Sequence, residues 1–315
     1  MKNKTHSVAI VVPVYGRGEN LPELASRTDN TFKNANLDQP TIIFIDDCGS
    51  SDSWNTITEL AKSRSKTKAI LLSKNFGQHN ALMCGFHEAR EAVVVTIDDD
   101  LQQEPESIPV LVNQLLENDL DLVYGTYGNK KHALGRNLGS TAVNAFYRFI
   151  FKTPTSVTSF RAIRQHLVQN VLSHQSGFVY LDGLFAWNSN RIGGVEIPHH
   201  ARSTGRSGYT ISKLIGLALN VFTNFSILPL QIVSWLGVAT FMVGTSLGCW
   251  FLFAAIFSFT TVPGFASIIV AVLILGGIQM LSLGAIGEYL GRIHINANGK
   301  PQFTIREKIE YQTRK

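Results

Sequence analysis

Three consecutive aspartates, Asp98-Asp99-Asp100, directly follow the apolar run 93–97 and precede Leu101-Gln102. The run predicts a buried strand, and an α/β sheet places its ligand chemistry at the carboxyl ends of its strands. Asp98 and Asp100 would point the same way in an extended segment. Carboxylates so placed suit Mg²⁺ or Mn²⁺ shared with a substrate's phosphates. The triplet is therefore a candidate metal and diphosphate site; the alternative is a solvated turn in which Asp caps a helix.

The elements that would position the triplet belong to an α/β sheet. Short runs rich in β-branched residues predict strands at 8–12, 41–45, 69–72 and 93–97. Helices are expected at 21–32 and at about 79–89. Strands separated by helices predict parallel βαβ units, whose polar loops gather at one edge of the sheet. The chain lacks the Gly-rich fingerprints of dinucleotide folds and P-loops, so metal and basic side chains would have to hold the phosphates.

Basic residues that could hold phosphates recur further along the chain, at Lys130, Lys131, Arg136, Arg161, Arg202 and Arg206. Arginine presents a planar fork that matches phosphate oxygens. Arg202 and Arg206 are the preferred candidates, because they lie in a Gly- and Ser-rich loop just before a long apolar region. For each of these residues the alternative is an ordinary surface position.

The apolar region, 214–287, contains no charged residue and no histidine. Two stretches in it, about 232–259 and 265–289, have the roughly 20 residues that a membrane span needs. A buried helical hairpin is the alternative, but it would require a polar face. Lys and Arg flank both stretches and are missing from the turn between them, which predicts that both ends are cytoplasmic.

These features predict four parts of the chain. Residues 1–209 would form a cytoplasmic catalytic domain, 210–228 an amphipathic helix on the bilayer surface or an ordinary packing helix, 229–290 two transmembrane helices, and 291–315 a cytoplasmic tail. The N-terminus does not read as a signal peptide. The net charge of +5 is modest and favours contact with anionic lipid over nucleic acid. Three widely spaced cysteines show no metal-ligand pattern. Gly237, Gly244 and Gly248 would permit close helix packing and hence a homo-oligomer.

A series of motifs resembles one known family. In order these are Pro13-Val14-Tyr15, Asp46-Asp47 with Ser50 and Asp52, Lys74-Asn75-Phe76-Gly77, the triplet with Leu101-Gln102 and Pro105, Ser159-Phe160-Arg161, and Arg202 with Gly205 and Ser207. Together they resemble the family 2 glycosyltransferases that charge polyprenyl phosphates, the group of bactoprenol glucosyltransferase and dolichol-phosphate mannose synthase. The resemblance covers nearly the whole chain.

The resemblance implies a GT-A fold, which is Rossmann-like with a mostly parallel sheet, a nucleotide-sugar donor, and Mg²⁺ or Mn²⁺. Pro13, Tyr15 and Asp47 would line the nucleoside site, with Asp99 near the ribose or diphosphate. Asp98, Asp100 and Gln102 would surround the metal. Arg136, Arg161 and Arg202 would hold phosphates and, with Asp100, serve as catalytic residues.

Several positions depart from the family pattern, among them Cys48, which reads as an insertion before Gly49-Ser50. Gly16-Arg17 stands where Asn-Glu is usual, and Glu19 is the candidate to replace that contact. Tyr127 stands where relatives often carry Arg, whose charge Lys130 or Lys131 would then supply. Ser159 replaces an Asp, so no acid role is carried over to that position.

The expected reaction is an inverting transfer from a UDP-sugar, such as UDP-glucose, to undecaprenyl phosphate on the cytoplasmic leaflet of the bacterial inner membrane, for cell-surface glycan modification. The acceptor phosphate is already anionic, so it needs positioning more than deprotonation. One alternative is a processive polysaccharide synthase, although such chains generally have more membrane helices and a tryptophan motif. The other is a non-catalytic sugar-nucleotide-binding partner of a flippase.

Overall fold

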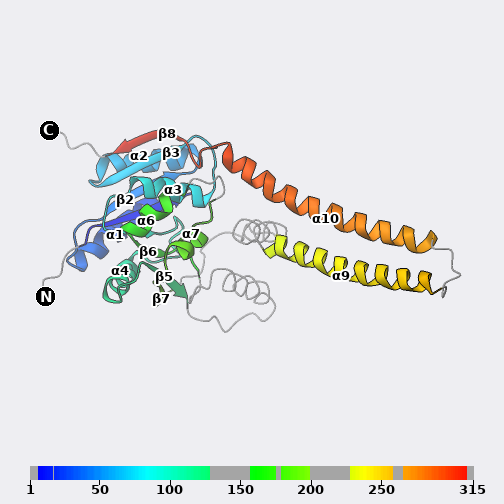
Figure 1. Cartoon of the computed structure of the whole chain (residues 1–315). Helices are drawn as coiled ribbons and strands as arrows, with labels where there is room; N and C mark the ends of the chain where they lie inside the picture. The colour runs from blue at the N-terminus through cyan, green and yellow to red at the C-terminus, as the bar shows by residue number, and fades with distance from the viewer. Residues whose placement is uncertain are drawn as a thin grey trace. The chain divides into compact units, whose positions relative to one another are not determined.

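The computed structural model describes residues 6–16, 18–127, 157–174, 179–198, 228–257 and 265–310 (Figure 1). The chain divides into two compact units, Met1–Ser207 together with Gly299–Lys315, and Gly208–Asn298. The segment between the two parts of the first unit thus forms the second unit.

In the described part of the first unit, eight strands form one mixed sheet in the order β7-β5-β6-β4-β1-β2-β3-β8. The strands are β1 (Val8–Val14), β2 (Thr41–Asp46), β3 (Thr67–Leu72), β4 (Val93–Thr96), β5 (Leu122–Tyr127), β6 (Arg161–Arg164), β7 (Ile192–Ile197) and β8 (Ile305–Glu310). Strands β4, β1, β2 and β3 run parallel to one another. Strand β6 runs antiparallel to both β4 and β5, and β8 runs antiparallel to β3. The four predicted strands and the α/β class are confirmed.

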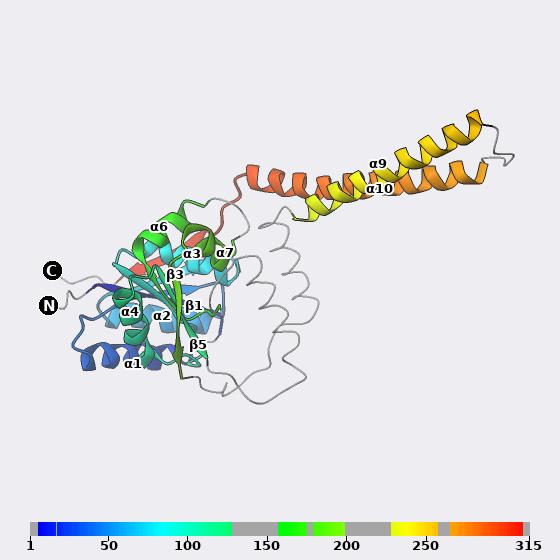
Figure 2. The ribbon, with the colours of Figure 1, turned by 60° about the horizontal axis from the view of Figure 1, so that its bottom comes forward.

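Helices cover both faces of this sheet. They are α1 (Leu21–Asn34), α2 (Ser51–Ser63), α3 (Gln78–Glu88), the 3₁₀ turn η1 (Pro105–Ser107), α4 (Ile108–Glu117), α6 (Gln165–Leu172) and α7 (Leu181–Asn188). Figure 2 shows α1, α2 and α4 on one face and α3, α6 and α7 on the other. The predicted helices at 21–32 and 79–89 are confirmed as α1 and α3, whereas α2 was not predicted.

The core lies where these helices meet the central strands. All seven residues of β1 are buried, as expected for a strand with helices on both sides. Helix α3 approaches β1 closely at Gly85, where a Cβ atom would lie 2.2 Å from Cγ1 of Val11. A larger residue at Gly85 would therefore push α3 away from the sheet.

The C-terminal segment contributes the edge strand β8, a pairing that the sequence did not predict. Ile309 lies opposite Ala69 of β3 and packs against the core. The Nζ atom of Lys308 lies 2.7 Å from Glu88 Oε2 and 2.8 Å from Glu310 Oε1. Because β8 pairs with β3, the backbone N–H and C=O groups on the outer side of β3 have partners in the sheet.

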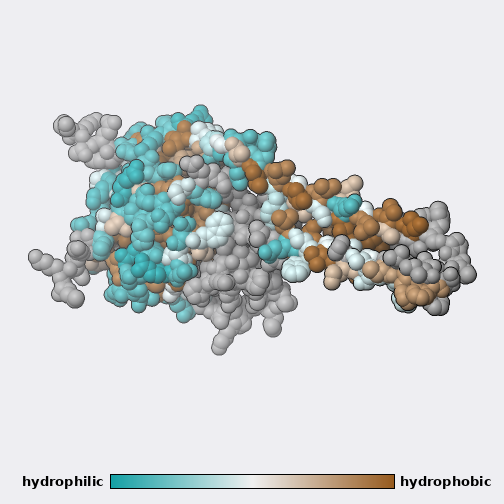
Figure 3. Space-filling view, viewed as in Figure 1, coloured by the Kyte–Doolittle hydropathy of each residue, from teal (hydrophilic) through white to brown (hydrophobic). Residues whose placement is uncertain are grey.

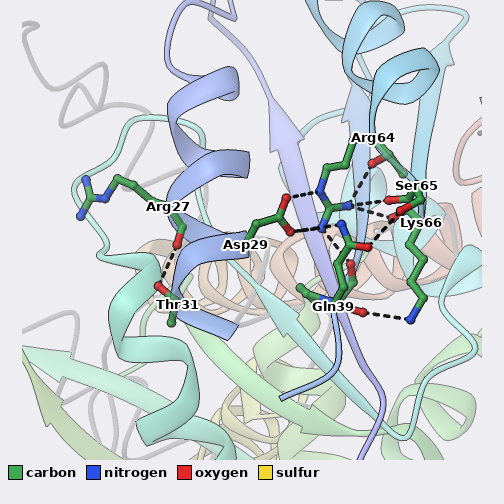
Figure 4. A network of polar contacts seen from close by, with 9 residues as sticks. Arg27, Asp29, Thr31, Gln39, Arg64, Ser65 and Lys66 are labelled. Atoms are coloured by element: carbon green, nitrogen blue, oxygen red, sulfur yellow. Dashed lines mark hydrogen bonds and ion pairs between the residues drawn. The ribbon is translucent and has the colours of Figure 1, made fainter. Parts of the chain in front are cut away.

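A buried arginine organises the amino-terminal edge of the sheet (Figure 4). The guanidinium of Arg64, which follows α2, donates to Asp29 Oδ1 at 2.7 Å and to Asp29 Oδ2 at 2.9 Å. It also donates to the carbonyls of Pro40, Ser65 and Lys66 and to the hydroxyl of Thr67. This network ties α1 and α2 to the starts of β2 and β3.

The second unit contains two long helices, α9 (Leu228–Ile256) and α10 (Phe265–Ala297). Large apolar side chains are exposed along both helices; they include Trp235, Leu236, Trp250, Ile274, Met280 and Leu283. Figure 3 shows brown, hydrophobic residues along this part of the chain. Within the described part of the chain, no helix combines the length and the apolar character needed to cross a membrane, so the predicted spans are not confirmed. The predicted interfacial helix at 210–228 lies outside the described residues, except for Leu228, where α9 begins.

Candidate active site

The predicted site residues of β1, β2 and β4 come together at the carboxyl edge of the sheet. The backbone N–H of Tyr15, just after β1, donates to Asp99 Oδ2 at 3.0 Å. The N–H of Phe76, in the loop after β3, donates to Asp47 Oδ1 at 2.7 Å. One carboxylate thus links the loops after β1 and β4, and another links the loops after β2 and β3, at the edge where the strand pattern predicted that loops gather.

Asp99 binds the loop that follows β1. Its Oδ2 atom also accepts from the N–H of Gly16 at 3.2 Å, and its carbonyl accepts from Asn20 Nδ2 at 3.4 Å. Burial raises the pKa of Asp99, and the two backbone donors counteract this only in part. Tyr15 itself is 40% exposed, whereas Pro13 is buried within β1. The Asp99 carboxylate thereby fixes the loop that the sequence assigned to the nucleoside; Glu19 of the same loop is exposed.

Asp98 lies at the centre of a hydrogen-bonded cluster. Its Oδ1 atom accepts from Gln78 Nε2 at 2.9 Å, and Oδ2 accepts from Ser159 Oγ at 2.6 Å and from Gln103 Nε2 at 3.1 Å. Burial raises the pKa of Asp98; the Ser159 hydroxyl opposes the rise, and the charges of Asp100 and Asp99 add to it. The carboxylate therefore already has three donors from the protein.

The prediction that Asp98 and Asp100 lie in an extended segment is wrong. The chain turns at Asp99-Asp100, and Leu101 adopts a left-handed φ of 57°. The physical cause is local, because Asp100 Oδ1 accepts from the N–H of Gln102 at 3.1 Å and so bends the backbone. The triplet does form a turn, but a half-buried one rather than a solvated one.

The predicted metal site is not confirmed as a cluster of acids. No three His, Cys, Asp or Glu side chains within the described ranges surround a common metal position. The donors Asp100 and Gln102 nevertheless fit Mg²⁺ or Mn²⁺. Among the described residues, Gln102 Nε2 is buried and has no hydrogen-bond partner, and rotating that amide would place a carbonyl oxygen there instead. A hard cation satisfies such an oxygen, and Mg²⁺ takes few protein ligands when it also binds phosphates.

The pair Asp46-Asp47 shapes the loop after β2. Asp46 accepts from the N–H of Gly49 and from Ser53 Oγ, both at 2.7 Å, and so secures the start of α2. The two carboxylate oxygens of Asp47 accept from the N–H groups of Phe76 and Gly77, both at 2.7 Å. Asp47 is therefore an anchor for the loop after β3 in this structure.

Arg161 does not lie where a phosphate could reach it. The residue is 2% exposed; its guanidinium pairs with Asp182, and Nε donates to Thr96 Oγ1 at 3.1 Å. It also stacks 5.6 Å from the centre of the Phe185 ring. The role predicted for Arg161 is thus corrected to that of a core ion pair. Arg136 and Arg202, like Lys130, Lys131 and Arg206, lie outside the described residues.

The family model described as "Glycosyl transferase family 2" matches residues 9–177. The undecaprenyl-phosphate 4-deoxy-4-formamido-L-arabinose transferase of Pectobacterium carotovorum subsp. carotovorum (strain PC1) is 30% identical, over 98% of this chain and 95% of its own. The chain belongs to glycosyl transferase family 2. The predicted enzyme class, a glycosyltransferase, is thereby confirmed.

Two further similarities were found, one to another transferase and one to a solved structure. The transferase of the same name from Yersinia enterocolitica serotype O:8 / biotype 1B is 31% identical over 97% of this chain and 94% of its own. Among solved structures, glucosyl-3-phosphoglycerate synthase from Mycobacterium tuberculosis, in complex with Mn²⁺, UDP and glucosyl-3-phosphoglycerate, is 15% identical with a TM-score of 0.49. That similarity covers 69% of this chain and 78% of that chain.

Sequence reasoning missed Gln78 and Gln103 as neighbours of the triplet in this family 2 glycosyltransferase. It named Ser159 and Tyr127 but did not place them beside the triplet. Burial raises the pKa of Tyr127, which ends β5, and the charge of Asp98 raises it further. The available signal was positional, because Gln103 directly follows the acidic motif and Gln78 follows the Phe76-Gly77 motif. Gln78 lies 20 residues from Asp98 and Gln103 lies 56 residues from Ser159, so no local pattern revealed these contacts.

The geometry suits this glycosyltransferase to binding a positively charged or metal-complexed ligand at the carboxyl edge. Burial raises the pKa of Asp47, Asp98 and Asp99. Among the ion pairs of the described residues, none involves these three carboxylates. A cation brought by the substrate or held beside Asp100 would offset this concentration of negative charge.

Proposed function

We propose that the chain transfers a sugar from a nucleotide-diphosphate sugar, a UDP-sugar, to undecaprenyl phosphate. The observation that carries this proposal is the 30% identity to an undecaprenyl-phosphate sugar transferase over 98% of the chain. The similarity includes the catalytic half and the apolar region alike, so it extends to the part that would meet a lipid acceptor. UDP-glucose and formamido- or amino-pentose nucleotides are the first donors to test.

Asp100 and Gln102 would hold Mg²⁺ or Mn²⁺ beside the donor's diphosphate. Such an ion, when bound, neutralises the charge that develops on the departing nucleotide diphosphate. Asp98 would stand behind these two ligands, because its carboxylate is already bound by Gln78, Gln103 and Ser159.

The loop after β1 would contact the nucleoside. Asp99 holds this loop through the N–H groups of Tyr15 and Gly16, and the exposed ring of Tyr15 is available to stack on a base. Asp47 would support the nucleoside site by fixing the loop after β3 at Phe76 and Gly77. The donor is thereby oriented before the acceptor arrives.

Arg136 and Arg202 are proposed to bind the phosphates of donor and acceptor. In the reaction, an oxygen of the polyprenyl phosphate forms a bond to C1 of the sugar. The bond from C1 to the diphosphate oxygen breaks, and the electron pair leaves with the nucleotide diphosphate. In-line displacement inverts the configuration at C1, and the anionic phosphate needs no dedicated general base.

The apolar region is proposed to anchor the enzyme in the bacterial inner membrane. Residues at about 232–259 and 265–289 would span the bilayer, with 210–228 at its surface and both termini cytoplasmic. The proposal is supported by the uncharged sequence 214–287 and by the exposed apolar side chains of α9 and α10. Membranes carrying the protein should retain it after an alkaline carbonate wash, and release into the wash would contradict the anchor.

A nucleotide-release assay tests the transfer reaction. Purified full-length protein is incubated with each donor, with and without undecaprenyl phosphate, and the released nucleotide diphosphate is measured. Release that depends on the lipid phosphate is expected for one donor. Equal release with and without lipid would support donor hydrolysis and contradict transfer to this acceptor.

A further inference from the structure

Gln103 is the most heavily engaged polar side chain around the acidic turn. It is 4% exposed. Its Oε1 atom accepts from the backbone N–H of Asp98 at 3.0 Å, while Nε2 donates to Asp98 Oδ2 at 3.1 Å and to Ser159 Oγ at 2.7 Å. The Gln103 amide therefore binds both the backbone and the carboxylate of Asp98. It also connects them to Ser159, which lies two positions before β6.

An amide suits this position because it has a donor and an acceptor at opposite ends. A carboxylate there would place a second anion against Asp98, and a hydrocarbon would leave the Asp98 N–H without its acceptor. Side-chain hydrogen bonds of a buried polar group orient the group they contact. Gln103 therefore sets the direction of the Asp98 side chain and the place where the chain enters the turn.

Hydrogen bonds fix the turn between Asp98 and Gln103 at its two ends and at Asp99. Gln103 closes it on Asp98, Asp99 is held by the N–H groups of Tyr15 and Gly16, and Leu101 takes a φ of 57°. Asp100 and Gln102 lie between these fixed points. Their direction thus depends on the bonds that close the turn.

We propose that Gln103 is a positioning residue that closes the acidic turn and thereby aims Asp100 and Gln102 at a divalent cation. The inference rests on the proposed function, because it takes these two side chains as cation ligands. Gln103 itself does not contact the ion. Its role resembles that of the outer partners that orient ligands in other metal sites, whose loss weakens metal binding without removing a ligand.

The test compares Gln103→Leu with the matched surface variant Gln169→Leu, since Gln169 is exposed on α6. Full-length protein in detergent is titrated with Mn²⁺ alone, with UDP and with GDP, and free Mn²⁺ is followed by electron paramagnetic resonance. Gln103→Leu is expected to weaken nucleotide-dependent Mn²⁺ binding about 10-fold to 100-fold. Gln169→Leu should match the wild type.

A second variant, Gln103→Glu, keeps the size of the side chain and an acceptor for the Asp98 N–H but loses both donors. It should also weaken Mn²⁺ binding by about 10-fold or more. Thermal unfolding of each variant establishes the folded fraction to which the binding refers. A purely structural role would lower that fraction and leave the Mn²⁺ affinity of the folded protein unchanged.

The outcomes separate this inference from the function on which it rests. Mn²⁺ binding by folded Gln103→Leu and Gln103→Glu at wild-type affinity would overturn the positioning role alone. Failure of the wild type to bind Mn²⁺ with either nucleotide would overturn the cation site of the proposed function, and the positioning role with it.

Discussion

The two edges of one sheet hold their carboxylates in different ways. At the amino-terminal edge, Asp29 pairs with Arg64, and Asp121, just before β5, pairs with Arg191. At the carboxyl edge, Asp47, Asp98 and Asp99 are bound by backbone N–H groups, amides and a hydroxyl, and the described ion pairs include none of them. Among the described residues, arginines pair with Asp29 and Asp121 at the first edge, whereas neutral groups donate to Asp47, Asp98 and Asp99 at the second.

The pKa directions follow this difference. Burial alone would raise the pKa of Asp121, but hydrogen bonds from Ser189 and Arg191 outweigh it and lower that pKa. At the carboxyl edge burial prevails, and the pKa of Asp47 is raised despite its two backbone donors. Neutral donors therefore hold these carboxylates in place without compensating their charge.

This contrast distinguishes charge used for stability from charge reserved for a ligand. The guanidinium of Arg64 donates to six acceptor atoms of the protein, so its donors are used within the protein and not by a substrate (Figure 4). The carboxyl edge keeps the buried Gln102 Nε2 without a partner among the described residues. Substitutions at the first edge should change stability, and those at the second should change activity.

The largest effect is expected from Asp100→Asn. Removing a charge that would stabilise the cation beside the diphosphate should lower the transfer rate about 100-fold to 1000-fold. The protein should remain folded in membranes, because Asn keeps an oxygen for the Gln102 N–H. The exposed Asp38→Asn serves as the control and should transfer normally. Unchanged turnover by Asp100→Asn would remove Asp100 from the mechanism.

The amino-terminal edge is tested by Arg64→Leu against Arg27→Leu. Arg64 is buried, so its loss should lower the free energy of unfolding by about 2–3 kcal/mol. Arg27 pairs with Glu106 on the surface, and its loss should cost less than about 1 kcal/mol. Thermal unfolding of the full-length protein in detergent measures both. Equal losses would show that the buried network contributes no more to the free energy of unfolding than a surface ion pair does.

The edge strand β8 provides a smaller test within one element. Ile309 packs against the core, so Ile309→Ala should lower the free energy of unfolding by about 1–2 kcal/mol. Ile305 in the same strand is 39% exposed, and Ile305→Ala should cost no more than about 0.5 kcal/mol. If the two variants unfold alike, β8 does not pack on the sheet in solution.

The smallest effect concerns pH and compares Asp47→Asn with Asp121→Asn. A raised folded pKa means that Asp47 contributes stability at low pH, and that this contribution falls as pH rises above its ordinary value of 3.8. A lowered folded pKa means that Asp121 contributes stability above pH 3.8, and that this contribution is lost as pH falls. The free energy of unfolding of the wild type minus that of the variant should be measured between about pH 3 and pH 6. This difference should decrease with pH for Asp47→Asn and increase with pH for Asp121→Asn. Parallel slopes would contradict the contrast between the edges.

Much of the sheet could be predicted because its signals are local. Runs such as 8–12 and 93–97 alternate with helical stretches, and this pattern also places the loops at one edge. Helix α2 was missed although Ser50 caps its first turn and Ile57 and Ala61 lie on its buried side. Strand β8 was missed because its partner β3 lies more than 200 residues away in the sequence.

The site was predicted less completely than the fold. The motif residues Tyr15 and Asp99 do meet, and Asp47 meets Phe76, because parallel strands deliver their loops to the same edge. The burial of Arg161 could not be read from its neighbours, since its partner Asp182 lies on α7. The turn after Asp98 likewise depends on the tertiary contact between Gln103 and Ser159. Such contacts become visible only once the elements have packed.

We propose that the acidic carboxyl edge serves metal-dependent sugar transfer to a lipid phosphate. Purified full-length protein is incubated with undecaprenyl phosphate and a panel of nucleotide sugars, with Mn²⁺ or with EDTA, and the lipids are analysed by mass spectrometry. The account predicts one glycosylated undecaprenyl phosphate that forms with Mn²⁺ and disappears with EDTA. No lipid product from any donor, or a product formed equally in EDTA, would contradict it.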